Sequence, residues 1–376
     1  MTVWDGLVGQ TRVVETLQRA VAGDMTHAWL FTGPPGSGRS NAAIAFAAAL
    51  QCERGGCGEC HSCHTAMIGS HEDISVTRTQ KLTIGVDDVR QLVRGSALAP
   101  VGRRYQIMIV EDADRLTDQA ANALLKAVEE PTERTVWLLC APTVEDVLPT
   151  IRSRARLVVL ATPSAGDVAG FLVRRDGVSP QRASYAARAS QGHIGRARAL
   201  ATDEATFARR REVVRIPGEL TTLGGCLTAA SNLHDSATEE SGEMTSRIDA
   251  REREDLDVVY GVVERGRRPR EYAPAMRDLE RSQKTRAKRR VLDVVDRGLM
   301  DLVSVYRDAI AVQIGGPDVG LVNEENRADV MALAQSSTPE QNLTRIESVF
   351  TAREQMLEFN VPPLLALEAM TMALRS

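Results

Sequence analysis

One short segment constrains this chain more than any other. Residues 33–40 read Gly-Pro-Pro-Gly-Ser-Gly-Arg-Ser, which fits the phosphate-binding pattern G-x-x-x-x-G-K-[ST] at every position except Arg39. An apolar run at residues 27–32 precedes the segment, and an alanine-rich run at residues 40–50 follows it. Strand, glycine loop and helix in this order predict a nucleotide-type α/β fold, because the loop amides and the helix N-terminus form a cradle for phosphate.

The arginine in this loop bears on the chemistry that we expect. A lysine ammonium is compact, whereas a guanidinium is planar, longer and forked, so the exchange is not conservative at a phosphate site. Nucleotide binding through the loop backbone therefore survives the exchange more readily than hydrolysis does. The residues expected to contact nucleotide are Gly33, Gly36, Ser37, Gly38, Arg39 and Ser40. The competing interpretation is a tight Gly/Pro turn without a ligand.

A pair of carboxylates follows the apolar run at residues 105–110. Glu111 and Asp112 stand where nucleotide-binding folds hold Mg²⁺ and orient the attacking water. ATPases of this type usually read Asp-Glu there, so the inverted order argues against efficient hydrolysis; a solvated acidic turn is the alternative. Residues 135–141 predict another buried strand, and Thr143 just beyond it completes the candidate nucleotide site.

The segments between these strands have helical patterns. Thr117 is the expected N-cap and Pro131 the stop of an amphipathic helix, and residues 157–160 predict a further strand. Apolar strands that alternate with helices predict a parallel sheet of the α/β class.

Four cysteines crowd into twelve positions. Cys52, Cys57, Cys60 and Cys63 have the spacing C-x₄-C-x₂-C-x₂-C, with glycines between them. Four thiolates can close a tetrahedral shell around Zn²⁺, and a closed shell predicts a structural metal rather than a catalytic one. An iron–sulfur cluster and four unligated thiols are the alternatives.

Composition narrows the class of protein. The chain has 376 residues, enough for two or three domains, and a formal net charge of −4. It has six cysteines and no apolar stretch that could span a bilayer, so we expect a cytoplasmic protein with metal-bound or free thiols. Aromatic residues make up only 4% of the chain, which disfavours a stacking platform for single-stranded nucleic acid.

Several stretches together carry a family resemblance. They are residues 4–10, residues 27–33, the cysteine segment 52–63, residues 122–131 (Asn-Ala-Leu-Leu-Lys-Ala-Val-Glu-Glu-Pro) and residues 151–154 (Ile-Arg-Ser-Arg). This combination resembles the clamp-loader ATPases of bacterial DNA polymerase III, which belong to the AAA+ class, and most closely the delta-prime type. The helix motif and the cysteine segment together are highly specific, and the matching stretches span residues 1–160.

The resemblance implies a division into three domains. An α/β AAA+ (P-loop) domain with a parallel sheet would cover residues 1–162 and include the zinc module at 52–63. A small helical lid would cover residues 163–205, and an all-helical collar domain would cover residues 206–376. Within the last domain, residues 231–290 are polar and charged, which predicts a flexible insertion or, in part, a long solvated helix.

The resemblance also assigns one catalytic residue. The family's arginine finger lies in a Ser-Arg-Cys motif, and the corresponding residues here are Ser-Arg-Ala, with the arginine at Arg154. Such an arginine acts in trans on the γ-phosphate held by a neighbouring subunit. A basic lead-in to the next strand is the alternative, and it suits Arg152 and Arg156 better. In motor subunits a second arginine stands where this chain has Gly195.

These features imply a mostly passive delta-prime subunit that helps to load the sliding clamp in DNA replication and hydrolyses ATP poorly. Its implied partners are the gamma/tau motor subunits and the delta subunit in a hetero-oligomeric ring, with the clamp and primer-template DNA reached through the complex and no membrane. Structural Zn²⁺ is the implied metal, and binding of ATP or ADP with Mg²⁺ stays open. The rival hypotheses are an active gamma/tau-like motor ATPase and a zinc-dependent nucleic-acid-binding module.

Overall fold

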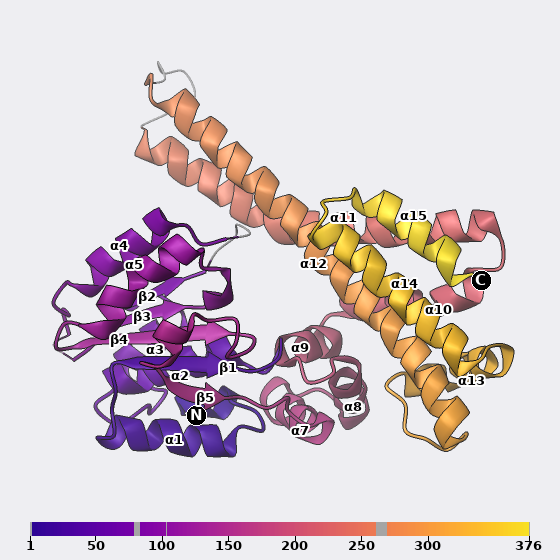
Figure 1. The fold of residues 1–376 in the computed structure, drawn as a ribbon, viewed down its shortest axis with the longest axis horizontal. Coiled ribbons are helices and arrows are strands. Elements are labelled where there is room, and N and C mark those ends of the chain that lie inside the picture. Colours follow the sequence, from indigo (N-terminus) through magenta and orange to yellow (C-terminus); the bar gives the residue numbers. More distant parts are fainter. Residues whose placement is uncertain (1, 79–82, 103, 261–268, 376) are drawn as a thin grey trace. The chain divides into compact units, whose positions relative to one another are not determined.

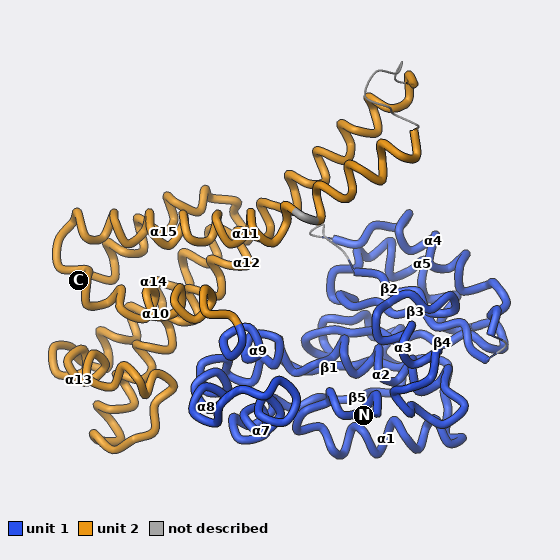
Figure 2. The backbone as a smooth tube through the Cα atoms, turned by 180° about the vertical axis from the view of Figure 1, so that it is seen from behind, with its two compact units in different colours: residues 1–202 blue, residues 203–376 orange. Residues whose placement is uncertain are grey.

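A computed structural model gives the fold of residues 2–78, 83–102, 104–260 and 269–375, the side chain of Arg247 excepted. The chain divides into two compact units, residues 1–202 and 203–376 (Figure 2). Each unit has hydrophobic clusters of its own. The further division of the first unit into a nucleotide-binding domain and a lid stays a prediction.

A five-stranded parallel sheet forms the centre of the first unit (Figure 1). Its strands, in the spatial order β2-β3-β4-β1-β5, are β2 (Ile74–Thr77), β3 (Gln106–Val110), β4 (Thr135–Ala141), β1 (Ala28–Thr32) and β5 (Arg156–Val159). Every residue of β1, β3 and β4 is buried, which explains why these strands are continuous apolar runs. The predicted parallel α/β sheet is confirmed, although the sequence analysis missed β2.

Successive strand residues alternate between two helical layers. Trp29, Phe31 and Leu138 belong to one hydrophobic cluster, and Leu30 and Leu139 belong to the other. The helices of the first cluster are η1 (Val3–Gly6), α1 (Thr11–Ala22), α2 (Arg39–Gln51) and α3 (His61–Met67). Those of the second are α4 (Val86–Ser96), α5 (Asp118–Glu129) and α6 (Pro149–Arg152).

The predicted fold class is confirmed by this topology. The glycine loop joins β1 to α2, the acidic pair follows β3, and β1 lies between β4 and β5, as in the AAA+ type of P-loop domain. Thr117 is the N-cap of α5, since its hydroxyl accepts from the backbone N–H of Ala120 at 3.2 Å. After the sheet come three helices that pack on one another, α7 (Ala165–Asp176), α8 (Pro180–Ala189) and α9 (Ile194–Thr202).

The second unit is entirely helical in its described residues. It consists of α10 (Glu204–Glu219), α11 (Leu223–Val259), α12 (Tyr272–Gly315), η3 (Glu324–Asn326), α13 (Arg327–Ser336), α14 (Pro339–Leu357) and α15 (Pro363–Leu374). Its main core joins Leu233 of α11, Leu302 of α12 and Leu367 of α15. The predicted all-helical C-terminal domain is therefore confirmed.

The expectation of a flexible insertion at residues 231–290 is wrong for most of that segment. Residues 231–259 lie within α11 and residues 272–290 lie within α12, which pair side by side (Figure 1). The alternative, a long solvated helix, fits this segment better. Between the two paired helices, buried polar side chains make the contacts that apolar residues make in the core. The predicted non-helical basic run at 265–270 lies mostly outside the described residues.

Candidate nucleotide and metal sites

The phosphate loop has the backbone that its glycines predict. Gly33, Gly36 and Gly38 have φ values of 153°, 84° and 92°, which side chains with a Cβ rarely adopt. Ser37 is 2% exposed, and its hydroxyl has no hydrogen-bond partner among the described residues. A buried hydroxyl beside the N-terminus of α2 suits an anion such as phosphate, so the loop residues fit a nucleotide.

Arg39 bends back on its own loop. Its guanidinium Nη1 donates to the carbonyl oxygen of Gly33, the residue that begins the loop. This contact turns the side chain toward a protein acceptor, away from the role of a point charge between two phosphates. The loop therefore keeps its amide cradle while its only cation is held by the backbone.

Glu111 is likewise bound by a protein group. Its carboxylate is buried at the end of β3 and accepts two hydrogen bonds from Arg78, one of them from Nη2 to Oε1 at 2.9 Å. The accepting carboxylate raises the pKa of the Arg78 guanidinium above its ordinary value. An arginine thus neutralises the carboxylate that the sequence analysis assigned to Mg²⁺. Arg78 directly follows β2, and missing that strand meant missing this partner.

The remaining predicted nucleotide residues lie at the same edge of the sheet. Asp112 follows Glu111 directly, and the backbone of Pro142 accepts from the N–H of Gly33 at 3.1 Å, which places Thr143 next to the loop. Burial raises the pKa of the Cys140 thiol at the end of β4, and the charges of Glu111, Asp112 and Arg39 all act on it. The fold therefore brings together residues from three distant segments.

A histidine from the segment after α8 also contacts the loop. A Cβ added at Gly36 would lie 2.6 Å from the Cβ of His193, so the loop and residue 193 pack in close contact. Gly195, where motor subunits were expected to have arginine, is in the first turn of α9 beside the His193 ring. The sequence marked this stretch only by the arginine that is missing at Gly195, and nothing in it marked His193 as a neighbour of the loop.

Arg154 lies apart from these residues, between α6 and β5. Its side chain is 41% exposed and pairs with Glu129, the last residue of α5, at 2.8 Å between Nη2 and Oε1. Nη1 donates to the carbonyl oxygen of Thr150 at 2.9 Å and to the hydroxyl of Ser153 at 3.2 Å. These contacts hold the guanidinium at the surface, as a finger that acts on another subunit requires. The role itself stays a prediction.

The four cysteines form a compact cluster. Their sulfur atoms lie within 4.8 Å of one another, and the Sγ of Cys52 is 3.6 Å from that of Cys57 and 3.7 Å from that of Cys60. Four sulfurs at 2.3 Å from a tetrahedral Zn²⁺ are separated by roughly 3.8 Å, which the distances from Cys52 to Cys57 and to Cys60 match closely. His61 and His64 are exposed and stay outside the cluster.

Backbone groups prepare this cluster for a cation. The N–H of Cys57 donates to the sulfur of Cys52, and that of Cys63 donates to the sulfur of Cys60, both at 3.5 Å. Burial alone would raise the pKa of the Cys52 thiol, but the N–H groups of Cys57, Gly56 and Arg54 outweigh it and lower that pKa to about 6. Burial raises the pKa of the Cys63 thiol, the most enclosed of the four.

Known proteins resemble the N-terminal part of the chain. Residues 9–164 match the family model described as DNA polymerase III, delta subunit. This part of the chain is therefore similar to delta-prime and gamma/tau subunits of DNA polymerase III.

Three relatives show how far the similarity extends. The gamma/tau subunit of DNA polymerase III from Mycobacterium tuberculosis is 40% identical over 154 residues, which are 39% of this chain and 27% of that protein. The delta-prime subunit from Pseudomonas aeruginosa is 38% identical over 156 residues, 39% of this chain and 47% of the relative. The delta-prime subunit from Escherichia coli is 36% identical over 186 residues, 48% and 55% of the two chains. The chain thus spans between a quarter and little more than half of these relatives.

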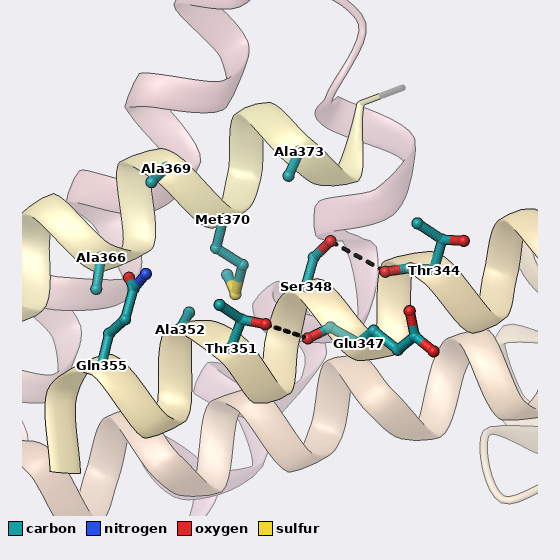
Figure 3. Close-up of a pocket in the computed structure, with 10 residues that line it drawn as sticks. All are labelled: Thr344, Glu347, Ser348, Thr351, Ala352, Gln355, Ala366, Ala369, Met370 and Ala373. Carbon is teal, nitrogen blue, oxygen red and sulfur yellow. Dashed lines mark hydrogen bonds between the residues drawn. The ribbon is translucent and has the colours of Figure 1, made fainter. Parts of the chain in front are cut away.

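Among the described residues, none of the helices combines the length and the apolar composition that a membrane span requires. A surface groove of about 280 Å³ lies between α14 and α15 (Figure 3). The hydroxyls of Ser348 and Thr351 that line it donate to carbonyl oxygens of their own helix, at 3.0 Å each. Hydroxyls that are already paired, beside small residues such as Ala366 and Ala369, suit the side chains of a packed partner better than a polar ligand.

Proposed function

We propose that this chain is a clamp-loader subunit of the delta-prime kind, which contributes Arg154 to a neighbouring motor subunit and hydrolyses little ATP itself. The observation that carries the proposal is the pairing of the chain's own nucleotide residues with protein groups. Arg39 is bonded to Gly33, and Glu111 is bonded to Arg78. A hydrolytic site needs both groups free, one for the phosphates and one for the metal.

Arg154 supports the other half of the proposal. It is exposed, it belongs to the motif that carries the finger in the related family, and its guanidinium is oriented by Glu129 and Thr150. An arginine that contacts a neighbour's γ-phosphate stabilises the charge of the transition state, and such residues contribute about 10³–10⁵ in rate. In this arrangement the chain supplies catalysis to a site that it does not contain.

Zn²⁺ would be held by Cys52, Cys57, Cys60 and Cys63. It would supply a structural cross-link between the end of α2 and the start of α3, because four thiolates leave no open coordination position. The partners that we propose are gamma/tau and delta subunits in a hetero-oligomer, and through it the sliding clamp and primed DNA in the cytoplasm.

Exposed apolar side chains of the second unit fit such an assembly. On α14, Leu343, Phe350 and Leu357 recur every seven residues and are 52%, 45% and 36% exposed. A seven-residue repeat on one face is the pattern with which helices pack against partner helices. We place the contact with other subunits on this face, and co-elution with the motor and delta subunits is the measurement that checks it.

The decisive experiment reconstitutes the loader from motor and delta subunits of the same organism and measures DNA- and clamp-stimulated ATP hydrolysis. We expect Arg154→Ala to lower the stimulated rate at least tenfold while the complex still co-elutes, since one finger is worth that much or more. Arg152→Ala is the matched control, because Arg152 is an exposed arginine two residues away with no ion pair among the described residues. The control should keep the full rate.

Two outcomes would contradict the proposal. An unchanged rate with Arg154→Ala would remove the trans-acting finger. If the isolated chain hydrolyses ATP and Arg39→Ala abolishes this activity, the result would favour a gamma/tau-like motor. This second candidate function is supported by the 40% identity to the gamma/tau relative.

A further inference from the structure

Two long helices extend beyond the core of the second unit as a paired arm. We define the arm as residues 241–260 of α11 and 272–290 of α12. The main core of this unit takes no fully buried residue from α11 after Ala237 or from α12 before Val295. The arm helices pack on each other beyond that point, and Figure 1 shows them without cover from the other helices of their unit.

Polar side chains hold the arm together. Arg286 is only 10% exposed and donates to Asp249 at 2.6 Å and to Glu252 at 2.8 Å on the opposite helix. Gln283 donates to the carbonyl oxygen of Asp249 at 3.0 Å, and the hydroxyl of Tyr272 donates to Asp257 at 2.6 Å. The α11 carboxylates that face α12 are therefore already used inside the arm.

The outer face of α12 carries cations that lack such partners. Arg277, Arg281, Lys284 and Lys288 are exposed and are spaced by four, three and four residues, which puts them on one face over about 16 Å. We call these four residues the basic stripe. Arg281 lies 3.9 Å from Asp278, with both side chains about 80% exposed, and the other three have no carboxylate partner among the described residues.

The same line of α12 changes character where the arm begins. At a spacing of seven residues, Arg281 and Lys288 are followed by Val295 and Leu302, both fully buried in the core. The line is apolar where other helices of the unit cover it, and it is basic where no other helix among the described residues of the unit lies over it. Any mixture of acidic and basic side chains would keep an exposed helix face solvated. Four basic residues on one face instead create a local positive potential, on a chain whose net charge is −4.

We propose that the basic stripe binds the phosphate backbone of duplex DNA without regard to sequence. Duplex DNA carries one negative charge per about 1.7 Å of its axis, so four cations along one helix face can each meet a phosphate. The described aromatic side chains of the arm, Tyr260 and Tyr272, meet edge to face with ring centroids 6.0 Å apart and an angle of 79° between the rings. They offer no platform for unpaired bases, which favours a duplex over a single strand.

The test uses the full-length chain and a fluorescent DNA duplex of about two helical turns, with anisotropy measured over a range of salt concentrations. Lys284→Ala/Lys288→Ala should weaken binding about tenfold at low salt. It should also reduce the slope of log K against log salt by about 1.8, since each phosphate contact contributes about 0.9. Alanine favours helix, so circular dichroism should show an intact arm.

The matched control is Arg215→Ala/Arg375→Ala, which removes the same charge from exposed positions of the same unit outside the arm. The control should bind like the unchanged chain. Equal weakening by both double variants would mean that only bulk charge acts and would overturn the proposal. So would an absence of duplex binding at low salt, or equally tight binding of a single strand. Because the test contains no other loader subunit, its outcome is independent of the function proposed for Arg154.

Discussion

The cysteine module and the nucleotide site of the first unit were both expected from motifs, yet they are assembled differently. The module takes its four cysteines from twelve consecutive positions, and all four sulfurs lie within 4.8 Å of one another. The candidate nucleotide site takes its residues from three segments that are some 30 to 110 positions apart. The fold brings these segments to one edge of the sheet, but Arg39 and Glu111 each bind a protein group there.

The difference shows how sequence distance acts on a site. Ligands within one turn-rich segment have their separation set by local backbone geometry, and the glycines at 55, 56 and 58, all with positive φ, suffice to close it. Residues from distant strands meet whichever long side chains the fold places beside them. A motif therefore predicts the position of such a site more reliably than the state of its functional groups.

The largest expected effect tests the module. Cys57→Ser should reduce bound zinc from about one per chain to near zero and lower the melting temperature, because the four-thiolate site loses one ligand and with it the folding energy that the metal supplies. Metal analysis and thermal unfolding measure both. Cys140→Ala is the control, since this buried thiol lies outside the cluster and its loss should leave zinc content unchanged. Zinc retained by Cys57→Ser would show that the cluster is not the metal site.

A smaller effect tests the nucleotide site. Arg39→Lys alone should change the affinity for Mg-ADP less than twofold, because Glu111 stays bound to Arg78. Arg39→Lys/Arg78→Ala should raise that affinity about tenfold, since it frees the carboxylate for Mg²⁺ and supplies a compact cation for the phosphates. Titration calorimetry measures both.

Arg94→Ala controls for the loss of an exposed arginine, because Arg94 has no ion pair among the described residues. If the double variant binds no better than the unchanged chain, the two arginine contacts do not limit this site.

The smallest effect concerns Ser37. Its buried hydroxyl lacks a partner, so Ser37→Ala should stabilise the nucleotide-free protein by about 1 kcal/mol, within the range for an unsatisfied buried hydroxyl. A phosphate in the loop would supply the missing partner, so in the presence of excess Mg-ADP we expect Ser37→Ala to destabilise the protein instead. Thermal unfolding with and without nucleotide distinguishes the two signs. Destabilisation without nucleotide would show that the hydroxyl already has a partner.

Particular elements show what could be predicted from the sequence. The apolar run at 135–141 is β4 residue for residue, and the predicted N-cap Thr117 caps α5. The sequence did not reveal β2 because it is a four-residue edge strand in which no residue is fully buried and the apolar residues Ile74 and Val76 alternate with polar ones. The arm was expected to be flexible because its charges suggested solvent, whereas they satisfy one another across two helices.

By itself, the sequence determined the glycine loop, the fold class and the cluster of four cysteines, because each depends on residues near one another in the chain or on the burial of whole strands. The tertiary structure alone decided that Arg78 neutralises Glu111, that His193 packs against Gly36, and that Glu129 orients Arg154. These contacts join residues 25 to 157 positions apart. The packing of the sheet and its helices brings them together, and no local pattern in the sequence records it.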